Sequence, residues 1–399
     1  MKKSLNNLLW NIYGFAFFNK LLLLSPVYAI FMQDNGMSGM QLSVLFVILS
    51  VTTAWAQIPV VWIIKKIGQK NSILLGQLLK GIGFIAWLIW PTFLGFALGM
   101  FLWGIMSAFY NTAFEGFVYD ELKARRQSKI YSRVLGFRYN VQAVGSALAA
   151  CGSLLMFMGY EWITIFSLIA LVISMICMLC IKQDKHKSMN KIQKVQQMSL
   201  FELFKKAFHI FRVTPCLFSI MLLCLLVIIF SYLNEYLSPI GIEIGIPVMY
   251  VGTMQLVVLG CTVIGQTFAY KFERVKNQVL YSAICLLGGM FMLFSFTYSI
   301  SWLWALCIAY ILSSALHVLL FTRFQDSMPS SYRTVILSLY SMLKSLVYGL
   351  MYLLMGWGGT LGGWSYSIRF VGIVLILTGI WAFLFIGNNC SSIDKFLKK

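Results

Sequence analysis

The sequence predicts an all-α polytopic membrane protein with twelve transmembrane helices in two pseudo-symmetric six-helix bundles. Hydrophobic residues make up 60% of its 399 residues and charged residues only 11%, whereas a soluble domain has about 25% charged residues. Apolar runs of about 20 residues, the length that crosses the hydrocarbon core of a bilayer, recur along the chain. Lys and Arg gather in alternate breaks between these runs, which is the distribution that sets membrane topology.

The apolar runs divide into six before a long polar break and six after it. Their predicted ranges are residues 10–32, 41–63, 72–91, 93–117, 136–158 and 161–181, then 215–237, 248–269, 279–298, 300–321, 334–357 and 365–387. The long break is rich in lysine and has little apolar periodicity. We therefore predict an N-terminal bundle over residues 1–182, a cytoplasmic linker over 183–212 and a C-terminal bundle over 213–399.

The distribution of charge also predicts the orientation. Positive residues lie at the termini and in the even-numbered breaks, while the odd-numbered breaks carry Asp34, Glu161 and Glu243 or no charge. By the positive-inside rule, both termini are expected to be cytoplasmic. The formal net charge of +19 thus reflects topology, and we expect the lipid bilayer and not a nucleic acid as the partner of this surface.

No motif points to catalysis or to a metal. The sequence contains no P-loop, HExxH or GxSxG motif, and its three histidines, His186, His209 and His317, lack ligand spacing. Most of the nine cysteines lie inside apolar runs, where we expect them to pack as small apolar side chains. The chain is predicted not to be an enzyme and to have no cofactor.

A charged passage, residues 114–140, separates the fourth and fifth predicted spans and reads FEGFVYDELKARRQSKIYSRVLGFRYN. A related passage follows the tenth span. The residues that carry these patterns are Glu115, Tyr119, Asp120, Leu122, Tyr131, Arg133 and Gly136, then Asp326, Pro329, Tyr332, Arg333 and Ser338. With two equal halves of six spans, the chain resembles the major facilitator superfamily of secondary transporters, in particular a bacterial twelve-helix branch of drug and metabolite exporters.

The resemblance implies a transporter of the bacterial cytoplasmic membrane that works as a monomer on a small-molecule substrate. It implies further that a gradient of ions, here protons, drives the transport. The antiporter motif of the fifth helix is incomplete, since the chain keeps Gly136 and Gly145 but then has Ala149, Ala150, Ser153 and Leu154. This departure leaves the expected fold intact and weakens the case for drug/proton antiport.

Three lysines fall near the middle of predicted spans: Lys20, Lys80 and Lys344. A charge at that depth costs about 2.5 to 3.5 kcal/mol, so it requires a partner, a wet cavity or an escape to the interface. No carboxylate lies at the same depth, which predicts an electropositive cavity suited to an anionic or zwitterionic cargo. Other predicted cavity residues, for which helix packing is the alternative reading, are Asn19, Gln57, Tyr110, Asn111, Asn140, Tyr232, Gln255 and Tyr340.

The remaining predicted functional residues are two acids for proton coupling and a set of loop charges for a gate. Glu115 and Glu235 are candidates for proton coupling, because a buried carboxylate is the usual device for it. By analogy with the family, charges at the inner ends of the helices form a cytoplasmic gate, and the alternative is a set of solvated loop charges. The predicted gate residues are Lys65, Lys66, Asp120, Arg133, Arg138, Asp326 and Arg333.

These expectations lead to three readings of function. The first is proton-coupled efflux, by alternating access, of a small amphipathic molecule such as an antibiotic or a metabolite. The second is uptake or exchange of an anionic small solute, which the three lysines and the incomplete antiporter motif favour. The third is a membrane sensor or scaffold that moves nothing.

Overall fold

The computed structural model describes residues 2–127, 130–181, 215–328 and 333–386, and in these ranges every regular element is a helix. The chain divides into two compact units, residues 1–193 with 247–256 and residues 194–246 with 257–399. The predicted linker, residues 183–212, lies outside the described residues.

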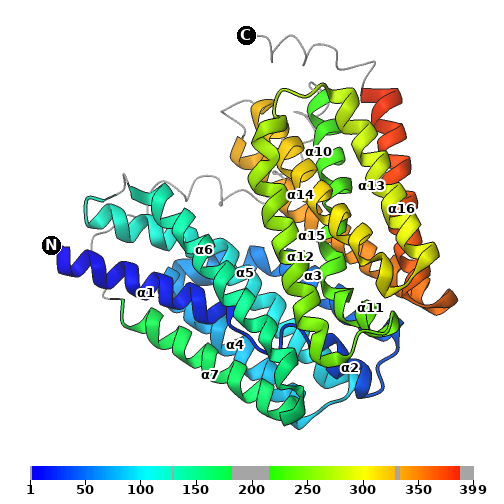
Figure 1. The fold of residues 1–399 in the computed structure, drawn as a ribbon. Coiled ribbons are helices and arrows are strands. Elements are labelled where there is room, and N and C mark those ends of the chain that lie inside the picture. The colour runs from blue at the N-terminus through cyan, green and yellow to red at the C-terminus, as the bar shows by residue number, and fades with distance from the viewer. Residues whose placement is uncertain (1, 128–129, 182–214, 329–332, 387–399) are drawn as a thin grey trace. The chain divides into compact units, whose positions relative to one another are not determined.

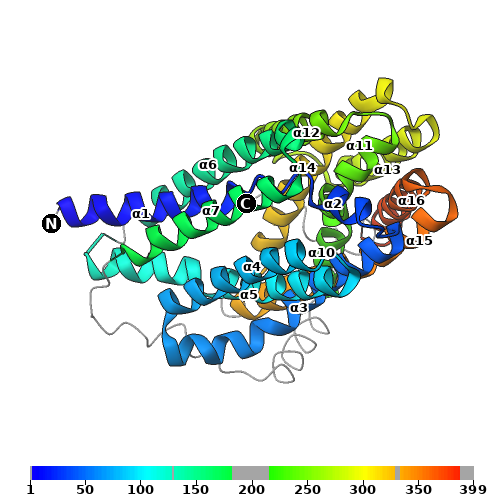
Figure 2. The same cartoon turned by 90° about the horizontal axis from the view of Figure 1, so that it is seen from below.

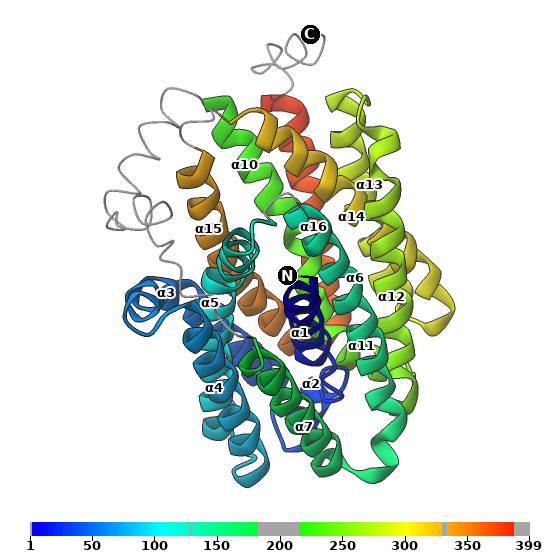
Figure 3. The same ribbon diagram turned by 90° about the vertical axis from the view of Figure 1, so that its left-hand side faces the viewer.

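The first unit contains the helices coloured blue to green in Figure 1. They are α1 (Lys2–Lys20), α2 (Tyr28–Asp34), α3 (Gly39–Ile67), α4 (Gln69–Ile89), α5 (Phe93–Ala124), α6 (Tyr131–Ala149), the 3-10 helix η2 (Ala150–Met158) and α7 (Tyr160–Leu179). Helix α1 packs against both α6 and α7, and α5 packs against α3 and α4, as Figures 2 and 3 show from two sides.

The apolar spacing of α1 explains this packing. Leu8, Ile12 and Phe15 recur at intervals of four and three residues and so lie on one face of the helix. All three are buried in a core with Phe114 and Phe117 of α5. Since a buried apolar side chain contributes about 1.5 to 3 kcal/mol, this core fixes the face that α1 presents to α5.

The second unit is built in the same way from the helices of the other half. They are α10 (Pro215–Val227), the 3-10 helix η3 (Ile228–Tyr236), α11 (Leu237–Glu243), η4 (Ala269–Phe272), α13 (Asn277–Thr297), η5 (Ile300–Trp302), α14 (Leu303–Asp326), α15 (Arg333–Gly362), α16 (Trp364–Trp381) and the π-helical turn η6 (Ala382–Ile386). Helix α12 (Val248–Phe268) begins in residues that group with the first unit and ends in the second. Helices α13 and α16 run side by side (Figure 1).

Within the described residues, eleven helices are long and apolar enough to cross a membrane. Each overlaps one of the predicted spans, so the all-helical membrane fold is confirmed. The twelfth, the predicted first span over residues 10–32, is not one continuous helix, because α1 ends at Lys20 and α2 begins at Tyr28. The cytoplasmic placement of the termini stays a prediction.

The interruption between α1 and α2 has a local cause. Pro26 has no N–H to donate to the Leu22 carbonyl, so a regular helix cannot run through this segment. The freed backbone is satisfied elsewhere: the Leu24 N–H donates to Ser167 Oγ of α7 at 2.9 Å. The second unit changes its helix type at the matching place, where α10 gives way to η3 and then to α11. A discontinuous helix such as that of the first unit is typical of secondary transporters, where it often lies at the substrate site.

Candidate functional site

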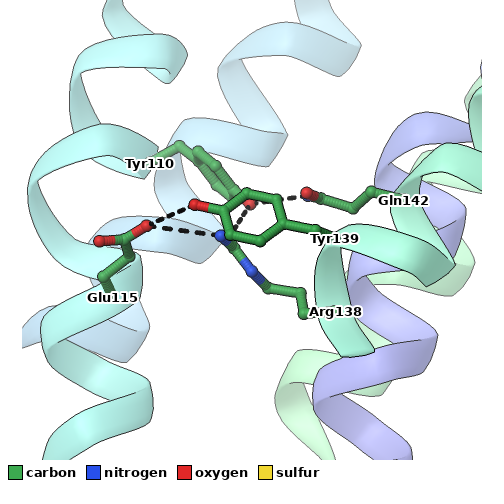
Figure 4. A network of polar contacts seen from close by, with 5 residues as sticks. All are labelled: Tyr110, Glu115, Arg138, Tyr139 and Gln142. Carbon is green, nitrogen blue, oxygen red and sulfur yellow. Dashed lines mark hydrogen bonds and ion pairs between the residues drawn. The ribbon is translucent and has the colours of Figure 1, made fainter. Parts of the chain in front are cut away.

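A polar network joins α5 to α6 in the first unit (Figure 4). Arg138 of α6 donates through one guanidinium nitrogen to the Tyr110 hydroxyl at 2.9 Å, and a second nitrogen lies 3.4 Å from Glu115 Oε1. The Tyr139 hydroxyl donates to the same carboxylate oxygen at 3.3 Å, and Gln142 donates to the Tyr110 hydroxyl at 2.9 Å. Arg138 thus contacts both Glu115 and Tyr110.

The two ions of this network differ in exposure. The Arg138 side chain is 3% exposed, whereas that of Glu115 is 53% exposed. The guanidinium also lies 4.2 Å from the centroid of the Tyr139 ring and 5.3 Å from that of Phe114, contacts that favour a cation. The acid therefore lies at the surface of the first unit, while the arginine is buried and held in place.

A second polar cluster lies where α1, α4 and α5 meet. Lys80 is only 4% exposed, and its amine lies 4.4 Å from the ring centroid of Trp103 and 5.6 Å from that of Phe84. One turn away on α4, Gln77 donates to Asn19 Oδ1 at 3.1 Å. No carboxylate of the described residues lies within ion-pair distance of Lys80. Lys20, by contrast, is exposed at the end of α1.

The predicted residues of the other half gather in the second unit. Tyr232 of η3 packs against Tyr348 of α15, with 6.0 Å between the ring centroids, and Lys344 and Tyr340 precede Tyr348 by one and two turns. Glu235 follows Tyr232 in η3 and is partly exposed. The sequence-predicted residues therefore contribute to two clusters in the first unit and to one in the second.

Several predicted cavity residues join neither cluster. Asn111 and Asn140 are exposed, and Gln57 and Gln255 are partly exposed. Of these, only Asn140 is a sequence neighbour of the Arg138 network.

The predicted gate residues contact different partners. Asp120 accepts a hydrogen bond from Gln69 at 3.3 Å. Arg138 lies against Glu115, and the Lys66 amine lies 3.6 Å from the Trp62 ring centroid. Lys65, Arg133 and Asp326 are exposed. Arg138 lies two turns into α6 and reaches Glu115 and Tyr110, whereas Asp120 bonds to Gln69 of α4.

Two residues of these clusters, Gln77 and Tyr139, were missed at the level of sequence. Gln77 precedes Lys80 by one turn, so helical spacing places both on one face. Tyr139 is the sequence neighbour of Arg138 on α6. A search for polar side chains three or four residues from each intramembrane charge would have found Gln77, while Tyr139, adjacent to Arg138, would have escaped it.

Comparison with solved structures shows the same fold in several transporters. The superposition on a bacterial homologue of the human lysosomal transporter Spinster covers 97% of this chain and 97% of that chain, with 16% sequence identity and a TM-score of 0.73. The nucleoside transporter NupG covers 96% and 99%, with 11% identity and a TM-score of 0.70. The xylose transporter XylE from E. coli covers 95% of both chains, with 13% identity and a TM-score of 0.67.

The comparison by sequence is consistent with these structures. A search of curated proteins found no match. The sequence model described as Major Facilitator Superfamily matches residues 9–351, which is most of the chain and includes helices of both units. The chain is therefore a member of the Major Facilitator Superfamily and a multi-pass membrane transporter.

Proposed function

We propose that this transporter couples the efflux of a small amphipathic molecule, an antibiotic or a metabolite, to the proton gradient by alternating access. The observation that carries the proposal is the Glu115–Arg138 pair. Glu115 is open to solvent and Arg138 is buried, so protonation of the acid removes the carboxylate that neutralises a fixed cation. A transporter coupled to protons needs such a change of charge between its two access states.

The proposed coupling runs through contacts on both sides of Arg138. When Glu115 is ionised, Arg138 bridges α5 and α6 through Glu115 and Tyr110. When Glu115 is protonated, the guanidinium keeps Tyr110 and its aromatic neighbours but loses its ionic partner. The hydrogen bond from Tyr139 to the carboxylate weakens at the same time. The packing of α6 on α5 would then depend on the proton.

Related folds and the composition of the second unit support the other parts of the proposal. One structure of the same fold is a D-xylose–proton symporter, with 12% identity and a TM-score of 0.65, so this fold accommodates proton coupling. The buried tyrosines of the second unit, each with an apolar ring and a polar hydroxyl, suit an amphipathic cargo. We propose further that the protein acts as a monomer in the bacterial cytoplasmic membrane and needs no cofactor beyond the gradient.

Uptake or exchange of an anionic solute is the second candidate. The buried Lys80, which has no carboxylate at ion-pair distance among the described residues, favours it because an anionic cargo would supply the missing charge. Direction and cargo charge therefore need to be measured together.

A proton-flux assay tests both candidates without a labelled cargo. Proteoliposomes that contain the full-length protein and a pH-sensitive dye are exposed to a panel of amphipathic molecules and small organic anions. We expect an amphipathic member to drive proton movement in the wild type but not in Glu115→Gln. The matched control is Glu161→Gln, an exposed acid at the start of α7. Cargo movement without proton movement would refute the coupling, and a response to hydrophilic anions alone would favour the second candidate.

A further inference from the structure

A buried lysine and a buried glutamine share one face of α4 in the first unit. Gln77 and Lys80 are three residues apart, a spacing that makes side chains neighbours on a helix. Gln77 is 1% exposed and Lys80 is 4% exposed. Because charged and amide side chains are seldom buried without partners, the contacts of these two show whether this face of α4 only packs or also binds.

Lys80 has aromatic neighbours and no anionic one. Its amine lies 4.4 Å from the ring centroid of Trp103 of α5 and 5.6 Å from that of Phe84. Within the described residues, no carboxylate lies at ion-pair distance from the amine and no group accepts a hydrogen bond from it. Ring faces attract a cation but leave its N–H donors without acceptors. Lys80 thus offers donors to an oxygen that this part of the chain does not supply.

Gln77 offers the opposite group. Its amide nitrogen donates to Asn19 Oδ1 of α1 at 3.1 Å, and this hydrogen bond holds the amide in place. The amide oxygen, Oε1, is buried and accepts no hydrogen bond from the described part of the chain. Buried acceptors without a donor are costly and rare. An unused donor and an unused acceptor therefore lie one turn apart on α4.

These side chains lie beside the break in the first predicted span. Asn19, which bonds to Gln77, is next to the last residue of α1. Tyr28, the first residue of α2, packs on Trp103 with 5.8 Å between the ring centroids. The segments on both sides of the break thus reach this cluster. Since secondary transporters commonly have their substrate sites at discontinuous helices, the location favours a bound molecule over packing alone.

Aromatic rings surround the Lys80 amine. Trp103 lies 5.7 Å from Phe84 and 6.1 Å from Trp87, and Phe84 lies 5.2 Å from Trp87, measured between ring centroids. A ligand whose charged end reaches Lys80 would place its next atoms among these rings. An apolar body suits this position, whereas a polar body would lose its water without gaining hydrogen bonds.

We propose that Lys80 and Gln77 bind the polar end of an amphipathic α-hydroxy acid, with its carboxylate at the Lys80 amine and its hydroxyl donating to Gln77 Oε1. The inference rests on the proposed transport function and adds the chemical class of the cargo. A simple carboxylate would satisfy Lys80 and leave Gln77 without a donor, and a neutral alcohol would do the reverse. An α-hydroxy acid carries both groups on adjacent carbon atoms, which matches two side chains that are neighbours on a helix.

Matched pairs of ligands test both contacts on the wild-type protein. Purified full-length protein in detergent is titrated with mandelate and phenyllactate, which carry a carboxylate, a hydroxyl and a ring. Phenylacetate and hydrocinnamate lack the hydroxyl, and the methyl esters of both hydroxy acids lack the charge. Binding is followed by the shift of the thermal unfolding temperature. We expect saturable stabilisation by at least one hydroxy acid at a concentration about tenfold below that needed for its deoxy partner or its ester, a difference of about 1.4 kcal/mol.

Variants assign each contact. Lys80→Met should remove the preference for the hydroxy acid over its ester, and Lys80→Arg should keep it. Gln77→Met should remove the preference over the deoxy acid and keep the preference over the ester. Lys271→Met and Gln278→Met are matched controls, since Lys271 is exposed with its amine 4.8 Å from the Phe268 ring centroid and Gln278 is exposed at the start of α13. Unfolding temperatures without ligand show whether each variant is folded.

The outcomes are separable from those of the proposed function. If neither hydroxy acid stabilises the protein, if each binds no more tightly than its deoxy partner, or if folded Lys80→Met keeps the wild-type preference for acid over ester, the site is wrong. The first two comparisons use the wild type, so a variant that fails to fold leaves the test decisive. Binding is measured without a gradient and leaves proton coupling untouched. Conversely, absence of cargo-driven proton flux with intact hydroxy-acid binding would refute the coupling and not the site.

Discussion

Arg138 on α6 and Glu115 on α5 form an ion pair at 3.4 Å in which only the acid is open to solvent. The buried arginine is held by a second hydrogen bond, to Tyr110, and by aromatic rings on two sides. The acid is therefore the member whose charge can change without displacing its partner. This asymmetry distinguishes the pair from a surface salt bridge, in which both ions are solvated.

We predict that Glu115→Gln abolishes the pH dependence of transport and barely changes stability. Glutamine mimics the protonated acid and still accepts the Tyr139 hydrogen bond. Because glutamine keeps an oxygen that accepts from Arg138 and Tyr139, the variant exchanges hydrogen bonds to a charged group for neutral ones, and the free energy of unfolding should fall by only about 1 kcal/mol. Transport rates measured across a pH range, with thermal unfolding of the same samples, check both parts. A pH profile that matches the wild type would exclude Glu115 as the coupling residue.

The membrane fold could be predicted from the sequence because it depends on composition and periodicity. Long apolar runs have few structural solutions in a bilayer, where each backbone polar group needs an internal partner. The exception is the first span, where Pro26 interrupts a run that is apolar enough to be read as one helix. Hydropathy measures the length of a run and not its hydrogen bonds, so it cannot detect this break.

The candidate site could be predicted only in part. The lysines were found because a charge in an apolar run is conspicuous, but their burial differs, since Lys80 is buried and Lys20 exposed. Which face of a helix turns inward depends on its neighbours, and a single sequence does not give them. For the same reason the sequence does not predict that Arg138 pairs with an acid 23 residues earlier on another helix.

Glu243 should stabilise the second unit by linking three of its helices. It ends α11, accepts a hydrogen bond from the Tyr298 hydroxyl at 2.7 Å and accepts another from the Trp364 N–H at 3.0 Å. We predict that Glu243→Ala lowers the free energy of unfolding by about 1 kcal/mol per lost hydrogen bond, whereas Glu243→Gln, which keeps an acceptor oxygen, loses less. Thermal unfolding of both variants checks this order. Equal stability of alanine and glutamine at this position would contradict it.

The hydrogen bond between Tyr298 and Glu243 also predicts how the stability changes with pH in the alkaline range. Burial, followed by the hydrogen bond to Glu243 and its negative charge, raises the pKa of Tyr298, which lies just beyond the end of α13. A raised pKa in the folded state favours the neutral phenol, so its contribution is complete below the ordinary value of about 10 and is lost as the pH rises above it. The free energy of unfolding should fall less steeply in this range in Tyr298→Phe. Identical slopes for the two proteins would refute the assignment.

Two adjacent glycines of α13 should respond in opposite ways to alanine. A Cβ on Gly288 would lie 2.7 Å from the Gly372 carbonyl oxygen of α16, whereas a Cβ on Gly289 would have nothing within 4 Å. Gly288→Ala must push α13 and α16 apart and should cost about 1 to 3 kcal/mol. Gly289→Ala should be neutral or stabilising by up to about 1 kcal/mol, because alanine is the better helix former. Thermal unfolding of the pair checks the sign at each position, and equal losses would show that the helices do not approach closely at Gly288.

Lys80 and Lys66 provide a matched pair that measures what a buried cation costs this protein. Each amine lies over a tryptophan ring, that of Trp103 at 4.4 Å and that of Trp62 at 3.6 Å, but Lys80 is buried and Lys66 is exposed. Replacing a buried charge that has no ionic partner by an apolar side chain of similar size removes a desolvation cost of several kcal/mol, which exceeds the roughly 2 kcal/mol of the lost cation–π contact. Lys80→Met should therefore unfold at the wild-type temperature or above it, and Lys66→Met should change stability by less than about 0.5 kcal/mol.

A loss of about 3 kcal/mol or more in Lys80→Met would instead match the cost of breaking a buried ion pair, and it would mean that Lys80 already has an anionic partner within the protein. In that case the lysine would belong to the scaffold, and the anionic-solute reading would lose the observation that favours it.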